Sequence, residues 1–150
     1  MVRLGIGMYG YSSNPEFKSK LKDSIFWKSS ISQLKTIQKG DSVGYGRTFI
    51  ADEEMKIAII PLGYADGFRR SLSNGKGAVW IKGNCCKVVG RVCMDMIMVN
   101  VTGLSIQEGD PVEIIGDQQK MEDFASQMET IPYEVMTSFS RRVHRVYIES

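Results

Sequence analysis

The sequence predicts a mainly β protein: a small β-barrel of about seven to eight strands with one or two short helices. Three observations predict this fold, namely short runs of β-branched and aromatic residues, glycine-rich turns between those runs, and few helical stripes. The chain has 150 residues, of which 43% are hydrophobic and 24% charged. That composition is typical of a soluble globular domain with a substantial core.

The predicted strands follow one another at short spacing, and glycine, proline or charged residues close most of them. They cover residues 2–10, 24–37, 56–63, 77–83, 86–90, 96–103, 109–117 and 142–149. The clearest alternation lies in 96–103, where Ile97, Val99 and Val101 share one face and Met96, Met98 and Asn100 the other. We expect a half-buried or fully buried strand there.

Two segments favour helices. Residues 120–128 carry apolar side chains at i, i+3, i+4 and i+7, which predicts one buried stripe: Met121, Phe124, Ala125 and Met128. Residues 132–143 open a second short helix, with Pro132 in its first turn, where the missing N–H of proline costs nothing.

The composition argues against several classes of protein. A net charge of +2 is too small to indicate a nucleic-acid or membrane-surface partner, and no apolar run approaches the ~20 residues of a membrane span. The three cysteines Cys85, Cys86 and Cys93 include an adjacent pair, which is no disulfide framework and predicts a reducing, cytoplasmic location. With His144 as the single histidine, no metal site is predicted.

Four tyrosines stand beside residues that shape turns: Tyr9, Tyr45 and Tyr64 next to glycines, and Tyr133 after a proline. Each glycine has an ordinary interpretation as a turn or a close strand contact, but the repeated pattern indicates hydroxyls held toward a ligand. A catalytic tyrosine needs a cationic neighbour or a hydrogen-bonded imidazole, because its reference pKa is about 10. Arg47 lies on the same face as Tyr45 if this segment is a strand.

Three other patterns are weaker. Cys93 and His144 form a thiol–imidazole pair only if the fold brings them together, and packing is the simpler role for Cys93. The run from Gly5 to Gly10 matches GxGxxG but lacks the strand before it and the helix after it that a dinucleotide site needs. The arginines at 69–70 and 141–145 suit a salt-bridged surface better than an RNA site, because exposed aromatics do not interleave with them.

Five segments occur in one order: "VRLGIGMYG", "GDSVGYGRTFIA", "IPLGYADGFRR", "VGRVCMDMIMV" and "ETIPYEVMTSFSRRVHRVY". In this order the chain resembles, over nearly its whole length, the C-terminal part of pyridoxal-phosphate (PLP) dependent alanine racemases of fold type III. The resemblance implies that residues 1–20 end an upstream α/β barrel, which carries PLP on a lysine, and that residues 21–150 form the C-terminal β domain.

The resemblance also implies a reaction and an assembly. The family interconverts L- and D-alanine, which serves D-alanine supply for the cell wall, and it works as a head-to-tail homodimer. A proton must reach either face of a planar carbanion, so two bases are needed on opposite sides, and PLP serves as the electron sink. The resemblance implies that Tyr45, supplied by the partner subunit, is the base opposite the PLP lysine.

Further roles carry over one residue at a time, as implications of the resemblance. Arg3 matches the arginine that hydrogen-bonds the pyridine nitrogen of PLP, and Gly5 and Ile6 match residues whose backbone N–H groups hold its phosphate. The Tyr133 hydroxyl matches one that reaches the same phosphate. The backbone amide of Met94 matches one that contacts the substrate carboxylate. The positions that match the substrate access passage are Tyr64, Arg70, Arg91 and Ile131.

The segment that carries the PLP lysine in the family lies upstream and is absent from these 150 residues. We therefore expect the chain alone to bind PLP weakly or not at all and not to racemise alanine. The abrupt, strand-like start also predicts that Met1 is an internal residue or the start of a cut fragment. Three alternatives stay open: a broad-specificity amino-acid racemase, a fold-type III decarboxylase, whose C-terminal cysteine motif is not found here, and a non-catalytic β-barrel that binds RNA or protein.

Overall fold

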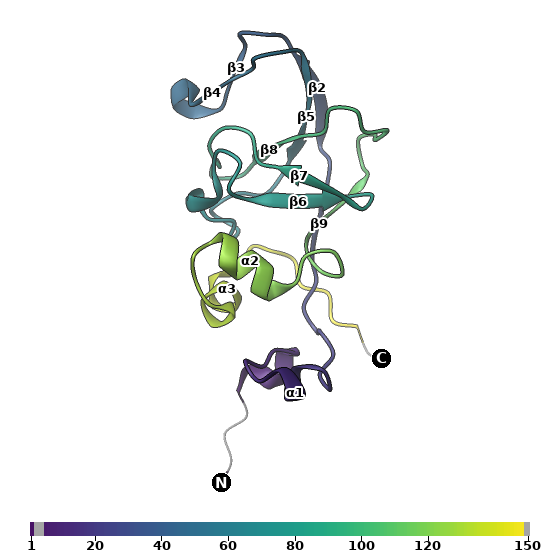
Figure 1. The fold of residues 1–150 in the computed structure, drawn as a ribbon, viewed down its shortest axis with the longest axis vertical. Coiled ribbons are helices and arrows are strands. Elements are labelled where there is room, and N and C mark those ends of the chain that lie inside the picture. Colours follow the sequence, from purple (N-terminus) through teal and green to yellow (C-terminus); the bar gives the residue numbers. More distant parts are fainter. Residues whose placement is uncertain (2–4, 149–150) are drawn as a thin grey trace.

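The computed structural model describes residue 1 and residues 5–148, and in this part of the chain the fold is mainly β. Figure 1 shows an elongated molecule, with the β3–β4 hairpin at one end and α1 near the other. The strands are β1 (Trp27–Ser30), β2 (Gln33–Ile37), β3 (Ser42–Val43), β4 (Phe49–Ile50), β5 (Met55–Ile60), β6 (Ala78–Ile81), β7 (Asn84–Lys87), β8 (Ile97–Asn100) and β9 (Pro111–Ile115). The α-helices are α1 (Pro15–Lys18), α2 (Met121–Gln127) and α3 (Pro132–Ser138), and the 3₁₀ turns are η1 (Ile6–Tyr9), η2 (Tyr45–Arg47) and η3 (Arg70–Leu72).

The strands form three antiparallel sheets. Their orders are β1-β9-β6-β7, β2-β5-β8 and β3-β4. An isolated antiparallel bridge joins Val88, the residue after β7, to Val99 of β8. Each sheet is an open ladder within the described residues, so the mainly β fold is confirmed, whereas the predicted closed barrel is not.

The predicted strand over 24–37 is two strands in two different sheets. The N–H of Ile31 donates to the carbonyl of Asp110 at 3.0 Å, whereas the N–H of Ser32 donates to that of Ile59 at 2.9 Å. The chain therefore passes from the β9 side to the β5 side between two neighbouring residues. Ile31 is buried at this crossing, where its side chain belongs to the larger of the two apolar clusters.

The alternation predicted in 96–103 is confirmed, and each face of this strand contributes buried residues to an apolar cluster. Ile97, Val99 and Val101 are buried in the larger cluster, and Met98 is buried in a smaller cluster beneath the hairpin end of the molecule. The larger cluster includes Trp27, Phe68 and Phe124. The ring centroids of Trp27 and Phe124 lie 5.9 Å apart. The β2-β5-β8 sheet thus joins the two clusters.

The two predicted helices are present. All four residues of the expected stripe, Met121, Phe124, Ala125 and Met128, are buried. Pro132 stands at the start of α3, as predicted, and Val135 of that helix is fully buried in the larger cluster. Each of these α-helices spans seven residues, and no helix of the described part of the chain is long and apolar enough to cross a bilayer.

Two predicted strands are wrong where the structure describes them. Residues 6–9 form the 3₁₀ turn η1 instead of a strand, and residues 142–148 form no strand. The C-terminal segment has apolar residues, but Val146, Tyr147 and Ile148 are each more than 70% exposed. Since a strand needs a neighbouring backbone to pair with, β propensity alone did not decide this segment.

Candidate functional site

Tyr45 stands at the tip of the β3–β4 hairpin and is 73% exposed. Its neighbours Gly44 and Gly46 have φ angles of 75° and 74°, a region that residues with a Cβ rarely adopt. The tip is a turn, not a strand, so the expectation that Arg47 shares a strand face with Tyr45 is wrong. Arg47 instead donates from Nε to the hydroxyl of Ser42 at 3.2 Å.

The same two glycines allow Arg91 to pack closely against the tip. A Cβ at Gly46 would lie 3.1 Å from Nη1 of Arg91, and a Cβ at Gly44 would lie 3.3 Å from the Arg91 backbone nitrogen. Both positions therefore favour glycine for conformation, and a Cβ at either one would make a tight contact with Arg91. The Arg91 guanidinium consequently lies beside the loop that carries Tyr45.

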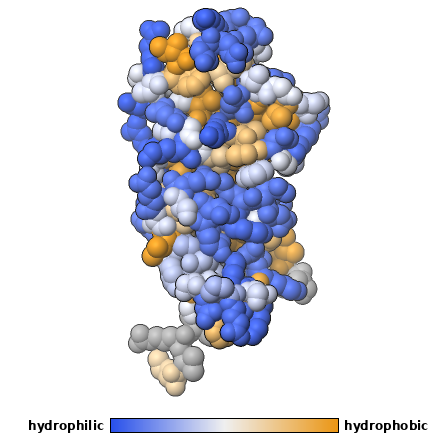
Figure 2. Space-filling view, in the orientation of Figure 1, coloured by the Kyte–Doolittle hydropathy of each residue, from blue (hydrophilic) through white to orange (hydrophobic). Residues whose placement is uncertain are grey.

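An open apolar groove runs beside Tyr45. Its volume is about 420 Å³, and Figure 2 shows apolar side chains emerging between polar ones toward this end of the molecule. The lining residues are Lys35, Ile37, Ser42, Val43, Gly44, Tyr45, Ile57, Ile59, Cys93, Met96 and Met98. Tyr45 thus stands at the edge of an open groove in which Met96 is exposed and most of the other apolar side chains are buried.

Met94 and Tyr64 lie on two loops that are joined by their backbones. The N–H of Tyr64 donates to the carbonyl of Cys93 at 3.0 Å, and the N–H of Ala65 donates to that of Met94 at 3.1 Å. A Cβ at Gly63 would lie only 2.3 Å from the Cys93 carbonyl oxygen, so the close approach requires glycine. The N–H of Met94 makes no hydrogen bond within the described residues.

A buried carboxylate connects the same loops to the C-terminal segment. Asp66 is 7% exposed, and it accepts the N–H of Gly63 at 2.8 Å and the Nε of Arg142 at 2.6 Å. Arg142 also pairs with Asp95. Its hydrogen bonds to Asp95 and Asp66 raise the pKa of Arg142. The sequence carried no local signal for this cluster, because Asp66 is 76 residues from Arg142 and Asp95 is 47 residues away.

The residues predicted to hold the cofactor lie elsewhere. Gly5 is exposed and Ile6 is buried at the start of η1, whereas Arg3 lies outside the described residues. Tyr133, on α3, packs edge-on against Tyr11 with ring centroids 6.2 Å apart, so α3 and the N-terminal segment are neighbours. The structure brings Tyr133 to this N-terminal end, and Figure 1 places the Tyr45 hairpin at the other end.

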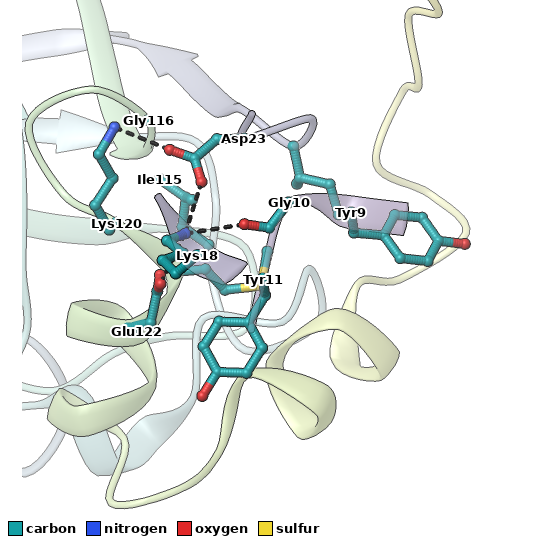
Figure 3. Close-up of a pocket in the computed structure, with 11 residues that line it drawn as sticks. Tyr9, Gly10, Tyr11, Lys18, Asp23, Ile115, Gly116, Lys120 and Glu122 are labelled. Atoms are coloured by element: carbon teal, nitrogen blue, oxygen red, sulfur yellow. Dashed lines mark hydrogen bonds and ion pairs between the residues drawn. The ribbon is translucent and has the colours of Figure 1, made fainter. Parts of the chain in front are cut away.

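A cluster of charged side chains anchors the N-terminal segment (Figure 3). The ammonium of Lys18 contacts the carbonyl of Gly10 at 3.0 Å, Asp23 at 3.0 Å and Glu122 of α2 at 2.8 Å, and Lys120 reaches Asp23 at 3.1 Å. Burial opposes these charges, but the hydrogen bonds to Glu122 and Asp23 leave the pKa of Lys18 raised. Likewise, despite burial, the bonds from Lys18 and Lys120 leave the pKa of Asp23 lowered.

The remaining candidates make structural contacts or lie exposed on the surface. Burial raises the pKa of Cys93, although the charge of Arg70 opposes the shift, and no hydrogen bond joins Cys93 to His144 among the described residues. Arg70 and Ile131 are exposed, and Arg69 pairs with Glu134. No group of His, Cys, Asp and Glu in residues 1 and 5–148 has the arrangement of a metal site.

These features define a class of protein: a β-rich domain that offers an exposed tyrosine and a free backbone N–H from loops at one end and packs its N-terminal segment at the other. A family model described as the alanine racemase C-terminal domain matches residues 25–147. The chain belongs to this family.

Known relatives agree with the family model. The alanine racemase of Cutibacterium acnes is 43% identical over 99% of this chain and 41% of its own length, and alanine racemase 1 of Clostridium acetobutylicum is 45% identical over 99% of the chain and 40% of its own length. The chain therefore spans about two-fifths of the length of the curated relatives it matches.

Solved structures share the fold. The alanine racemase of Streptomyces coelicolor A3(2) superposes with a TM-score of 0.90 at 33% identity, covering 99% of this chain and 41% of that one. The Bartonella henselae alanine racemase, whose structure contains covalently bound pyridoxal phosphate, superposes with a TM-score of 0.88 at 37% identity, covering 96% and 40%.

Proposed function

We propose that this chain is the C-terminal part of an alanine racemase that interconverts L- and D-alanine together with an upstream PLP-binding barrel. The observation that carries the proposal is the hairpin tip, where two left-handed glycines present Tyr45 to solvent beside Arg91. In this division, residues 1–20 end the barrel and residues 21–150 form the β domain. Family membership over residues 25–147 supports the second part of that division.

The residues at the N-terminal end suit the phosphate of PLP. Neither the N–H of Gly5 nor that of Ile6 makes a hydrogen bond within the described residues, and successive backbone N–H groups can form an anion-binding site. The Tyr133 hydroxyl is a further donor from a side chain that is 53% exposed, and Arg3 is proposed for the pyridine nitrogen. When bound, PLP supplies an electron sink that acidifies the substrate's α-proton.

Tyr45 is proposed as the base on one face of the substrate, with the barrel lysine on the other. The Tyr45 phenolate would take the α-proton and the neutral hydroxyl would return one, and the N–H of Met94 would donate to the substrate carboxylate. The exposed side chains of Tyr64, Arg70 and Ile131, with the half-buried Arg91, would line the passage by which substrate arrives. A narrow passage would favour small amino acids such as alanine.

The separation of these groups supports a head-to-tail homodimer. The Tyr45 hairpin and the N-terminal segment lie at opposite ends of the chain (Figure 1), so one copy does not bring Tyr45 and Gly5 to the same ligand. Two antiparallel copies would supply Tyr45 and Met94 from one chain and Gly5, Ile6 and Tyr133 from the other. The uncovered groove beside Tyr45 is a surface that such a partner would bury.

The proposal is tested with the complete gene product that contains these residues. It should bind PLP and convert each enantiomer of alanine into the other, and a panel of amino acids separates an alanine racemase from a broad-specificity one. The 150-residue chain alone should do neither, whereas turnover of L-alanine by that chain would contradict the division of labour. An in-frame stop codon directly before Met1 would also contradict it. Salt-dependent RNA binding without turnover would favour the non-catalytic alternative.

We further propose a cytoplasmic enzyme that serves D-alanine supply for the cell wall.

A further inference from the structure

One guanidinium joins the two loops that carry candidate substrate-binding residues. Arg142 pairs with Asp66, two residues after Tyr64, and with Asp95, the residue after Met94. Its contact with Asp66 uses two of the three guanidinium nitrogens, Nε at 2.6 Å and Nη2 at 3.4 Å. We call the three side chains Asp66, Asp95 and Arg142 the Arg142 bridge.

The Arg142 bridge links by charge the same two loops that the backbone hydrogen bonds of Tyr64 and Ala65 join. The side chain of Asp66 is 10% exposed, and those of Arg142 and Asp95 are 48% and 43% exposed. A buried carboxylate left without its cation is strongly destabilised. Without Arg142 the two carboxylates would also repel each other, and that repulsion would act to separate the two loops.

The position of Asp95 adds a consequence for substrate binding. The Met94 N–H is the proposed donor to the substrate carboxylate, and an uncompensated negative charge on the next residue would repel that anion. We propose that Arg142 is a positioning residue for the reaction: it fixes the Tyr64 and Met94 loops to each other and neutralises Asp95, so that the Met94 amide accepts an anionic substrate. This role rests on the proposed function.

The test is steady-state kinetics in both directions on the complete gene product. Arg142→Met should raise KM for alanine about tenfold, since a hydrogen-bonded charged pair is lost, and change kcat much less, since no reacting atom is touched. Arg142→Met/Asp95→Asn removes the uncompensated charge beside Met94 and should bring KM most of the way back to the wild-type value. Arg141→Met is the matched control, because Arg141 is exposed and makes no ion pair within the described residues.

The outcomes separate this role from simple structural support. Equal KM values for Arg142→Met and Arg141→Met would overturn the proposal, as would a raised KM that Asp95→Asn leaves unchanged. If Arg142→Met does not fold, Arg142→Lys keeps the charge but loses the two-nitrogen contact, and the same comparison is made with and without Asp95→Asn. An inactive wild-type protein would instead contradict the proposed function.

Discussion

The two ends of this molecule are held in place by different kinds of interaction. At the hairpin end, Tyr45 and its neighbours are positioned by backbone conformation, with Gly44 and Gly46 in the left-handed region and Arg91 packed against them. At the N-terminal end, ion pairs of Lys18 hold the segment to α2. Backbone geometry is insensitive to salt and pH, whereas ion pairs are sensitive to both. The two ends should therefore respond to different perturbations.

The largest effect is expected from removing one hydroxyl at the hairpin end. Tyr45→Phe keeps the ring and should lower turnover of the complete protein by about 10²- to 10⁴-fold, the usual contribution of a general acid–base group. The free energy of unfolding should not change, because Tyr45 is 73% exposed. Exchange of the α-proton with D₂O, started from each enantiomer, should fall much more from one side than from the other.

Tyr147→Phe is the matched control, since Tyr147 is also largely exposed and lies near the C-terminus. Equal losses in both directions, caused only by weaker substrate binding, would indicate a packing role for Tyr45.

A second effect is expected where two loops meet most closely. Gly63→Ala would put a Cβ 2.3 Å from the carbonyl oxygen of Cys93, and neither backbone gives way cheaply. We expect the free energy of unfolding to fall by about 1–3 kcal/mol, as in other overpacked sites, measured by urea denaturation of the chain. Gly7→Ala is the control, because nothing lies within 4 Å of a Cβ there. Equal free energies of unfolding for the two variants would mean that the two loops can move apart without an energetic cost.

These close contacts show why the sequence predicted some features and missed others. The buried stripe of 120–128 follows from local periodicity, so it was predictable. The division of 24–37 into two strands depends on Asp110 and Ile59, which pair with Ile31 and Ser32 from distant positions, and no local pattern reports that.

The candidate site divides in the same way. The glycines around Tyr45 gave a local signal of an unusual backbone, and the family resemblance assigned a role to Tyr45. The sequence around Arg142 showed only a basic run, because its partners Asp66 and Asp95 lie on loops far away in the sequence. The β-forming residues that follow this run led to the wrong strand prediction for the C-terminal segment. Side-chain pairing between distant loops is the part of a site that propensity and spacing do not encode.

A third, smaller effect separates conformation from contact at the hairpin. Gly46→Ala and Gly40→Ala both force a Cβ onto a left-handed residue, with φ of 74° and 90°, at a cost of roughly 1–2 kcal/mol each. Only the Cβ at Gly46 meets Arg91, at 3.1 Å, and nothing lies within 4 Å at Gly40. We expect similar losses of stability by thermal unfolding but a loss of turnover only for Gly46→Ala. Normal turnover in that variant would show that the Arg91 contact is dispensable.

The smallest effect is expected at the N-terminal end, and it should depend on pH and salt. Lys18→Met removes the contacts to Asp23 and Glu122 and should cost the chain about 0.5–1 kcal/mol at pH 7, since the side chains are about a third exposed and partly screened. Lys22→Met is the control, because Lys22 is exposed and makes no ion pair within the described residues. In 1 M salt the difference between the wild type and Lys18→Met should shrink.

The pH dependence of that difference has a defined sign. The pKa of Asp23 is lowered from its ordinary 3.8, so its stabilising contribution is present above that value and disappears as the pH falls through the lowered pKa. The pKa of Lys18 is raised from 10.5, so its contribution disappears only as the pH rises through the raised value. Denaturant unfolding should therefore show a constant gap between wild type and Lys18→Met from about pH 5 to pH 9. The gap should narrow in acid and in strong base, and a gap that persists below pH 3 would mean that Lys18 acts through packing of its hydrocarbon chain instead of its charge.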